Sequence, residues 1–156
     1  MRLLYASEKE IDDVIDLRIN YFRDTYINFS AEEENDLRKK LKEYFVNHLK
    51  KDCIVVLVKE GDCAVASAIL NLFKKAPNRR NPNGLFAEIY GVYTLKEKRR
   101  KGYATLLVKE LINYADKLNI SFIELEASKE GKGVYLNCGF QIVEKEYSEM
   151  KYYFND

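Results

Sequence analysis

An unbroken apolar run, Ile54-Val55-Val56-Leu57-Val58, is the feature that most limits how this chain can fold. A run of this kind is typical of a strand buried on both faces, because a half-exposed strand alternates apolar and polar residues. The Gly61-Asp62 pair that follows predicts a tight turn, which returns the chain into an antiparallel strand over residues 64–73. A strand buried on both faces needs other elements to cover each side of its sheet.

Three helices are predicted to provide that cover. Ser7 with Glu10, and Ser30 with Glu33, form capping boxes that predict helix starts, the second helix continuing to about residue 50. The strongest helical pattern lies in residues 102–118, where apolar residues recur at the i, i+3, i+4, i+7 spacing.

Strands are expected at residues 2–6, 85–94 and 122–127, then a short helix at residues 133–137. Residues 140–145 and 147–154 are expected to form a terminal hairpin. The predicted class is therefore α/β, with a mixed, mostly antiparallel central sheet of about six or seven strands and helices on both faces. The length of 156 residues, with 47% hydrophobic and 33% charged residues, fits one domain over residues 1–156.

Charge and cysteine usage exclude several classes of function. The net charge of +1 argues against a nucleic-acid-binding domain built on the basic segments 74–80 and 96–101, and no apolar run reaches the length of a membrane span. Cys53, Cys63 and Cys138 match no metal-ligand spacing. The predicted hairpin pairs Glu60 with Cys63 and therefore Cys53 with Leu70, which separates the two sulfurs and predicts no disulfide. With no signal peptide recognised, we expect a cytoplasmic protein that needs no metal.

The most informative segment is the basic connector, residues 96–101, with five Lys or Arg in six positions directly before the strongest helix. Cations at a helix N-terminus oppose the helix dipole, so the arrangement favours a bound anion. Free amides at a helix start, with a glycine that allows close approach, form a phosphate cradle. The alternative is a solvated basic turn. The glycine patterns of P-loops and of dinucleotide-binding folds are absent.

Arg99-Arg100-Lys101-Gly102-Tyr103-Ala104 resembles the [Q/R]-x-x-G-x-[G/A] signature of the GCN5-related N-acetyltransferase (GNAT) superfamily. Residues 88–94 upstream, residues 125–128 downstream and the Y-x-x-x-G-F element at residues 135–140 follow the family order, so the resemblance covers about residues 53–154. It implies the acyl-CoA N-acyltransferase (GNAT) fold, acetyl-CoA as co-substrate and an amine as acceptor.

The resemblance also implies a binding site for acetyl-CoA. Main-chain amides of residues 99–105 would wrap the diphosphate, and the strand before them would separate from its neighbour and bind the pantetheine through its backbone. Gly91 inside that strand supports a bulge, the alternative being a glycine that admits a bulky neighbour such as Phe122. The implied cofactor-binding residues are Val92, Tyr93, Thr94, Arg99, Arg100, Lys101, Gly102, Tyr103, Ala104, Thr105 and Ser128.

Two side chains are candidates for catalysis. Glu88 precedes Arg99 by 11 residues, a spacing similar to that of the glutamate base in the histone acetyltransferase branch. It would accept the amine proton through water; the alternative is a solvent-facing strand residue. Tyr135 would protonate the leaving thiolate; the alternative is a core tyrosine. Arg18 and Tyr21 are candidates for the acceptor cleft, with snorkelling to solvent as the default expectation for Arg18.

The predicted function is acetyl-CoA-dependent N-acetyltransfer onto a primary amine of a small molecule or peptide, by direct transfer in a ternary complex. The alternative is a non-catalytic acyl-CoA-binding sensor of the same fold. Neither nucleic acid nor a membrane is an expected partner. The tyrosine-rich tail, residues 147–154, is a candidate homodimer surface.

Overall fold

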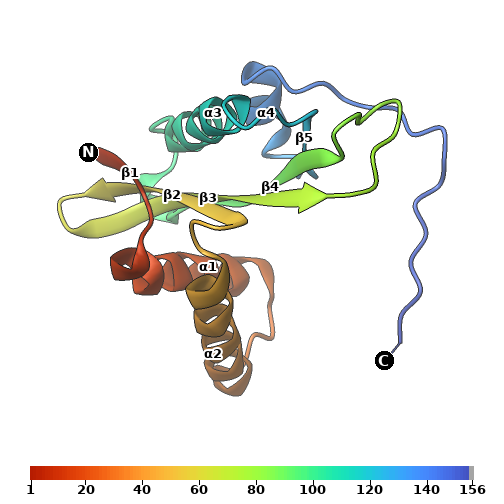
Figure 1. Cartoon of the computed structure of the whole chain (residues 1–156). Helices are drawn as coiled ribbons and strands as arrows, with labels where there is room; N and C mark the ends of the chain where they lie inside the picture. Colours follow the sequence, from red (N-terminus) through yellow and green to blue (C-terminus); the bar gives the residue numbers. More distant parts are fainter. Residues whose placement is uncertain (155–156) are drawn as a thin grey trace.

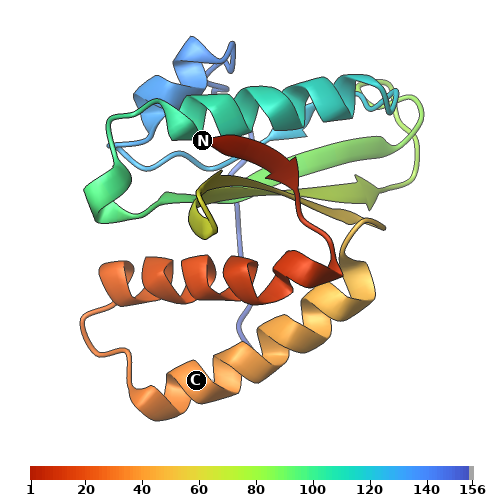
Figure 2. The same cartoon turned by 90° about the vertical axis from the view of Figure 1, so that its left-hand side faces the viewer.

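The computed structural model describes residues 1–154 as one sheet between two layers of helices (Figure 1). The strands lie in the order β1-β2-β3-β4-β5, antiparallel except for the last pair. Helices α1 (Ile11–Thr25) and α2 (Ala31–His48) cover one face, and α3 (Tyr103–Asp116) and α4 (Lys132–Asn137) cover the other (Figure 2). The strands are β1 (Arg2–Tyr5), β2 (Cys53–Glu60), β3 (Cys63–Lys74), β4 (Leu85–Thr94) and β5 (Ile123–Glu124).

Strand β2 is buried on both faces, as its apolar run predicts. Ile54, Val56 and Val58 join the core against α3, whereas Val55 and Leu57 join the core against α1. Successive side chains of a strand point to opposite sides, so β2 alone contributes to both hydrophobic cores.

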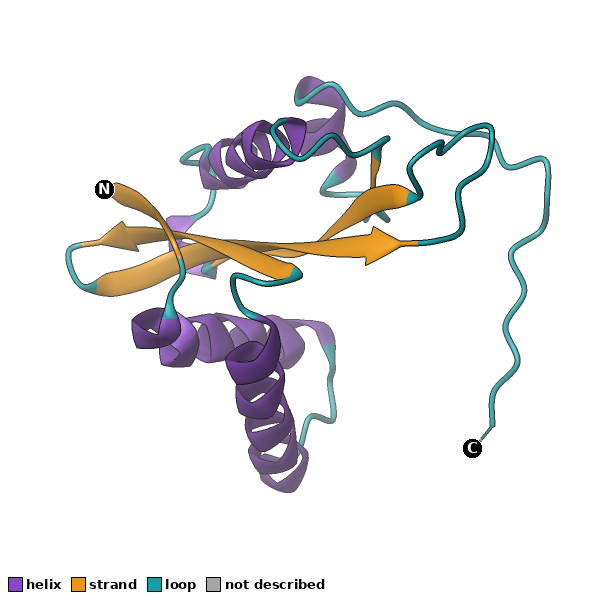
Figure 3. Ribbon diagram, viewed as in Figure 1, coloured by secondary structure: helices purple, strands orange, loops and turns teal. Residues whose placement is uncertain are grey.

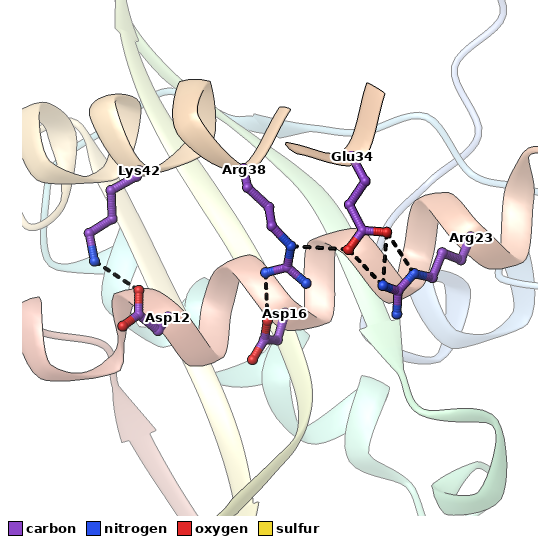
Figure 4. A network of polar contacts seen from close by, with 6 residues as sticks. All are labelled: Asp12, Asp16, Arg23, Glu34, Arg38 and Lys42. Carbon is purple, nitrogen blue, oxygen red and sulfur yellow. Dashed lines mark hydrogen bonds and ion pairs between the residues drawn. The ribbon is translucent and has the colours of Figure 1, made fainter. Parts of the chain in front are cut away.

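Both predicted capping boxes are present. The first opens a 3-10 turn, η1 (Glu8–Glu10), that leads into α1, and the second opens α2. On the outer side of the helix pair, a network of ion pairs ties α1 to α2 (Figure 4). Its N–O distances are 2.8 Å for Lys42–Asp12, 2.7 Å for Arg38–Asp16, 3.1 Å for Arg38–Glu34 and 2.6 Å for Arg23–Glu34.

The sheet of the described residues has five strands, so the prediction of six or seven was wrong. The strand predicted over residues 122–127 shortens to β5, and the predicted terminal hairpin is not formed. Residues 141–154 instead run as an exposed loop away from the layers (Figure 3). Charged residues interrupt the apolar residues of this segment, and its one ion pair, Lys145–Glu149, is local. A two-residue β5 offers little edge for further strands to pair with.

The hairpin between β2 and β3 pairs Glu60 with Cys63, as predicted, but Cys53 lies opposite Asn71 and not Leu70. A bulge between Val58 and Lys59 inserts one residue and shifts the register of everything beyond it. All three cysteines are free.

The basic connector between β4 and α3 contains a 3-10 turn, η2 (Lys96–Lys98), and is held at one end by Glu60. The Glu60 carboxylate accepts hydrogen bonds from Lys98 Nζ at 2.5 Å, Lys101 Nζ at 3.0 Å and the Tyr103 hydroxyl at 2.5 Å. The hydrogen bond from Lys98, followed by those from Tyr103 and Lys101, lowers the pKa of Glu60 to about 2. The β2–β3 turn thereby fixes the start of α3.

Asp24, near the end of α1, holds the connector from the other side. Its carboxylate accepts from the Tyr93 hydroxyl at 2.7 Å and pairs with Lys96 at 2.9 Å and Arg99 at 3.4 Å. The hydrogen bond from Lys96 contributes most to lowering the Asp24 pKa. The connector is thus tied to the sheet through Glu60 and to helix α1 through Asp24.

Replacing Glu60 by Gln should destabilise the protein at neutral pH, because the cations and the phenol lose their shared carboxylate. A carboxyl group with a lowered folded-state pKa contributes stability above its unfolded pKa, about 4.3, and loses it as the pH falls towards about 2. Urea unfolding of the wild type and Glu60→Gln should therefore give a stability difference that is full at pH 7 and narrows below about pH 4.3. Exposed Glu97→Gln is the control for charge alone, and an equal loss in that variant would contradict the anchoring role of Glu60.

Candidate active site

Strand β4 carries the bulge that its glycine predicts. Ser67 pairs with Tyr93 and Ile69 with Tyr90, so two residues of β4, Gly91 and Val92, lie opposite a single residue of β3. Gly91 has φ +60°, a conformation that side chains disfavour. A Cβ at Gly91 would lie 2.6 Å from Arg18 Nη1, so the bulky neighbour that this glycine admits is Arg18.

The outer edge of β4 is open beyond the middle of the strand. Strand β5 pairs with β4 only at Ala87–Ile123 and Glu88–Glu124. Two carboxylates stand side by side at the last pair, and like charges on adjacent strands disfavour further pairing. From residue 89 onward the backbone groups of β4 that point away from β3 face no partner strand. This opening lies next to the bulge.

The turn into α3 presents unused amides. Arg100 has φ +64° and Gly102 has φ +78°, and alternation with left-handed residues turns successive N–H groups toward one concave surface. No hydrogen bond within residues 1–154 uses the backbone N–H of residues 100–105. A Cβ on Gly102 would meet no atom within 4 Å, so the surface above the turn is open. Unsatisfied amides at the start of a long helix bind anions, phosphates above all.

The side chains of the connector are less available than their number suggests. Four of its five cations already pair with Glu60 or Asp24, and only Arg100 is exposed with no ion pair in the described part of the chain. The cluster of cations therefore does not by itself require a bound anion, because the protein's own carboxylates neutralise most of its charge. The amides carry the anion-binding capacity of this turn.

Glu88 lies where β4 and β5 separate. Its neighbours in sequence, Ala87 and Ile89, join the core against α3, so Glu88 lies on the face covered by α1 and α2. Burial, and then the carboxylates of Glu124 and Glu126, raise the pKa of Glu88. A partly buried carboxylate with a raised pKa is suited to accept a proton near neutral pH.

Tyr135 lies on α4, on the other side of the sheet. Its ring packs edge-to-face against Phe140 at 6.0 Å and joins the core against α3. Burial raises the pKa of the Tyr135 hydroxyl, with smaller contributions from Cys138 and from Tyr21 on α1. The phenol therefore stays protonated at neutral pH and can donate.

Other predicted residues have structural partners. The Ser128 hydroxyl accepts the Gly131 N–H at 3.0 Å and so caps the turn before α4. The Thr94 carbonyl accepts from Arg99 Nε at 3.1 Å, and the Tyr93 side chain is buried on Asp24. Ala104 and Thr105 occupy the first turn of α3, where their amides are free.

The structure contradicts the expectation that Arg18 snorkels. Its side chain turns toward the sheet, over the rings of Tyr21, Phe22 and Tyr90. An arginine within the apolar stripe of α1 is the one sequence signal of this arrangement, and only the position of Gly91 in space explains it.

Within residues 1–154, no cluster of three or more His, Cys, Asp or Glu side chains could hold a metal ion. No helix in that part of the chain is long and apolar enough to cross a membrane.

Known proteins share this sequence pattern and this fold. The family model described as "Acetyltransferase (GNAT) family" matches residues 12–140. A predicted acetyltransferase from Clostridium acetobutylicum, solved with acetyl-CoA, is 29% identical, with a TM-score of 0.83 and coverage of 96% of this chain and 95% of that chain. No curated protein sequence matches the chain.

Two more distant structures share the fold. Glucosamine-6-phosphate N-acetyltransferase from Arabidopsis thaliana is 19% identical, with a TM-score of 0.65 and coverage of 99% of this chain and 100% of that chain. An aminoglycoside antibiotic 6′-N-acetyltransferase from Acinetobacter haemolyticus is 19% identical, with a TM-score of 0.68 and coverage of 98% and 99%. Because the family model extends from the first helix of the chain through α4, this protein belongs to the acetyltransferase (GNAT) family.

Proposed function

We propose that this protein transfers the acetyl group of acetyl-CoA to a primary amine by direct transfer in a ternary complex. The observation that carries the proposal is the row of unused amides at residues 100–105, directly beside the open edge of β4. A diphosphate on those amides and an extended pantetheine along that edge would direct the thioester to the bulge. Acetyl-CoA supplies an activated acyl group, so the protein needs mainly to align it with the amine.

The chemistry divides between the two faces of the sheet. Glu88, on the face of α1 and α2, accepts the amine proton through water, and its raised pKa suits that role. Backbone near Val92, in the bulge, stabilises the negative charge that develops on the thioester oxygen. Tyr135, on the face of α3 and α4, donates a proton to the departing sulfur. Nothing among the described residues favours the alternative of a non-catalytic acyl-CoA sensor.

Gly102→Asp should abolish acetyl-CoA binding, because it adds a carboxylate beside the amides that would hold the diphosphate. Isothermal titration with acetyl-CoA measures the loss. Gly61→Ala is the control for backbone strain, because Gly61, like Gly102, has positive φ and open surroundings. Acetyl-CoA affinity should persist in Gly61→Ala. Unchanged affinity in Gly102→Asp would remove the proposed diphosphate site.

Tyr135→Phe should lower kcat by roughly tenfold or more while acetyl-CoA affinity changes little, because the ring packing remains and only the proton donor is lost. Release of the CoA thiol in steady state gives the rate. Tyr114→Phe on α3 is the control, since that ring packs on Tyr5 at 5.6 Å and lies outside the proposed site. Equal rates for Tyr135→Phe and wild type would make Tyr135 a core residue.

Glu88→Gln should lower kcat/KM by roughly a hundredfold and remove the acid limb of its pH profile. In the wild type, activity should fall as the pH drops through the raised pKa of Glu88, because the base must be ionised. Glu124→Gln removes one of the charges that raise this pKa, so it should move the limb to lower pH and keep kcat. An acid limb that neither variant alters would assign the base to another group.

A further inference from the structure

Arg18 is the most unusual charged residue of the fold. It lies midway along α1, and its guanidinium carbon is 4.8 Å from the ring centre of Phe22, 5.3 Å from that of Tyr21 and 5.7 Å from that of Tyr90. Its Nη1 occupies the space that a side chain at Gly91 would need. The guanidinium therefore lies in an aromatic cage at the β4 bulge.

Among residues 1–154, this cation has no counter-charge. No ion pair or side-chain hydrogen bond of residues 1–154 involves Arg18, whereas Arg23 on the same helix makes a forked contact with Glu34 at 2.6–3.0 Å. Burial lowers the pKa of Arg18, and the groups that offset this effect are tyrosines, with no carboxylate among them. Aromatic faces stabilise a guanidinium but leave its five N–H donors unused. A buried charge without a partner is costly, and buried charges in proteins are as a rule paired.

The location indicates what that partner is. Arg18 contacts the bulge from the side of α1 and α2, the same side on which Glu88 lies. The Tyr90 wall of the cage is held from behind, since its hydroxyl donates to Asn71 at 3.4 Å. A surface depression at the turn between α1 and α2 shares Phe22 with the cage and is lined by Tyr26, Phe29 and Leu37 together with the carboxylates of Glu33 and Asp36. An acceptor amine that reaches Glu88 from this side would therefore lie on the same face of the sheet as the guanidinium.

We propose that Arg18 binds an anionic group of the acceptor, a carboxylate or a phosphate, so that the substrate is a primary amine that also carries a negative charge. The inference rests on the proposed function and names the substrate class of that site. A planar guanidinium fork matches the two oxygens of either anion. The same cation disfavours a polycationic acceptor, so aminoglycosides and polyamines should be poorer substrates than anionic amines.

Matched pairs of amines test this inference. The wild type is assayed for CoA thiol release with α-amino acids against their amides, β-alanine against its amide, and glucosamine 6-phosphate against glucosamine; kanamycin and spermidine represent polycations. At least one anionic member should exceed its neutral partner in kcat/KM by roughly tenfold to a hundredfold. A preference for carboxylates or for the phosphate identifies which anion the site takes. Equal use of both members of every pair, or preference for the polycations, overturns the inference.

Arg18→Met should remove the preference by lowering kcat/KM for the anionic member alone, and Arg18→Lys should restore only part of it, because an ammonium lacks the fork. Arg23→Met is the matched control on the same helix and should leave the ratio unchanged. Should Arg18→Met fail to fold, Arg18→Lys and the wild-type panel carry the test. If Arg18→Met instead reduces the use of succinyl-CoA relative to acetyl-CoA, the residue binds the acyl donor and the inference fails.

Different results would contradict acetyl transfer and the role of Arg18. Failure of acetyl-CoA to bind in isothermal titration would remove the proposed function itself. Acetyl-CoA binding, with turnover of neutral amines but no preference for anionic ones, would remove only the role of Arg18. Acetyl-CoA binding without turnover of any anionic amine on the panel also counts against that role.

Discussion

The mismatch between β4 and β3, two residues against one, is the constraint on which the rest of the structure depends. An extra residue in a strand inverts the direction of every later side chain, because side chains alternate with a period of two. Tyr90 and Tyr93, three residues apart, consequently face the same helical layer. One forms a wall of the Arg18 cage, and the other reaches Asp24, which holds the basic connector. A single bulge thus sets the positions of both the Arg18 cage and the Asp24 contact that holds the turn into α3.

The cations of the connector and the cation of Arg18 are in different electrostatic surroundings. Two carboxylates, Glu60 and Asp24, pair with four of the five connector cations and fix the turn in place. Within residues 1–154 the amides that follow have no such partner, so the proposed anion site would depend on backbone geometry more than on side-chain charge. At Arg18 the opposite holds, since a full positive charge is enclosed by aromatic rings without a carboxylate. Within residues 1–154, carboxylates therefore neutralise four of the connector cations, whereas Arg18 beside the bulge has no ion pair.

Much of the fold could be predicted because its signals are local. Capping boxes, the apolar run of β2 and the periodicity of α3 each depend on a few neighbouring residues, and all appear where expected. The terminal hairpin was predicted wrongly because alternation alone does not provide a partner strand or a buried face. The predicted partner of Cys53 was displaced by one residue because the bulge at Val58–Lys59 leaves no mark in the sequence.

For the candidate site, too, features that belong to short motifs could be predicted and features that depend on distant segments could not. Glycine at position 91, the basic connector and the positions of Glu88 and Tyr135 could be chosen from sequence, since each belongs to a short motif. That the connector cations are already paired, and that Arg18 fills the space beside Gly91, could not be foreseen, because those partners are up to 75 residues apart in the chain. The sequence by itself determined most of the strands and helices and the turn that we propose to bind the diphosphate. Only the tertiary structure decided which charges remain without a partner, because charge pairing depends on distances in space between segments that local pattern does not bring together.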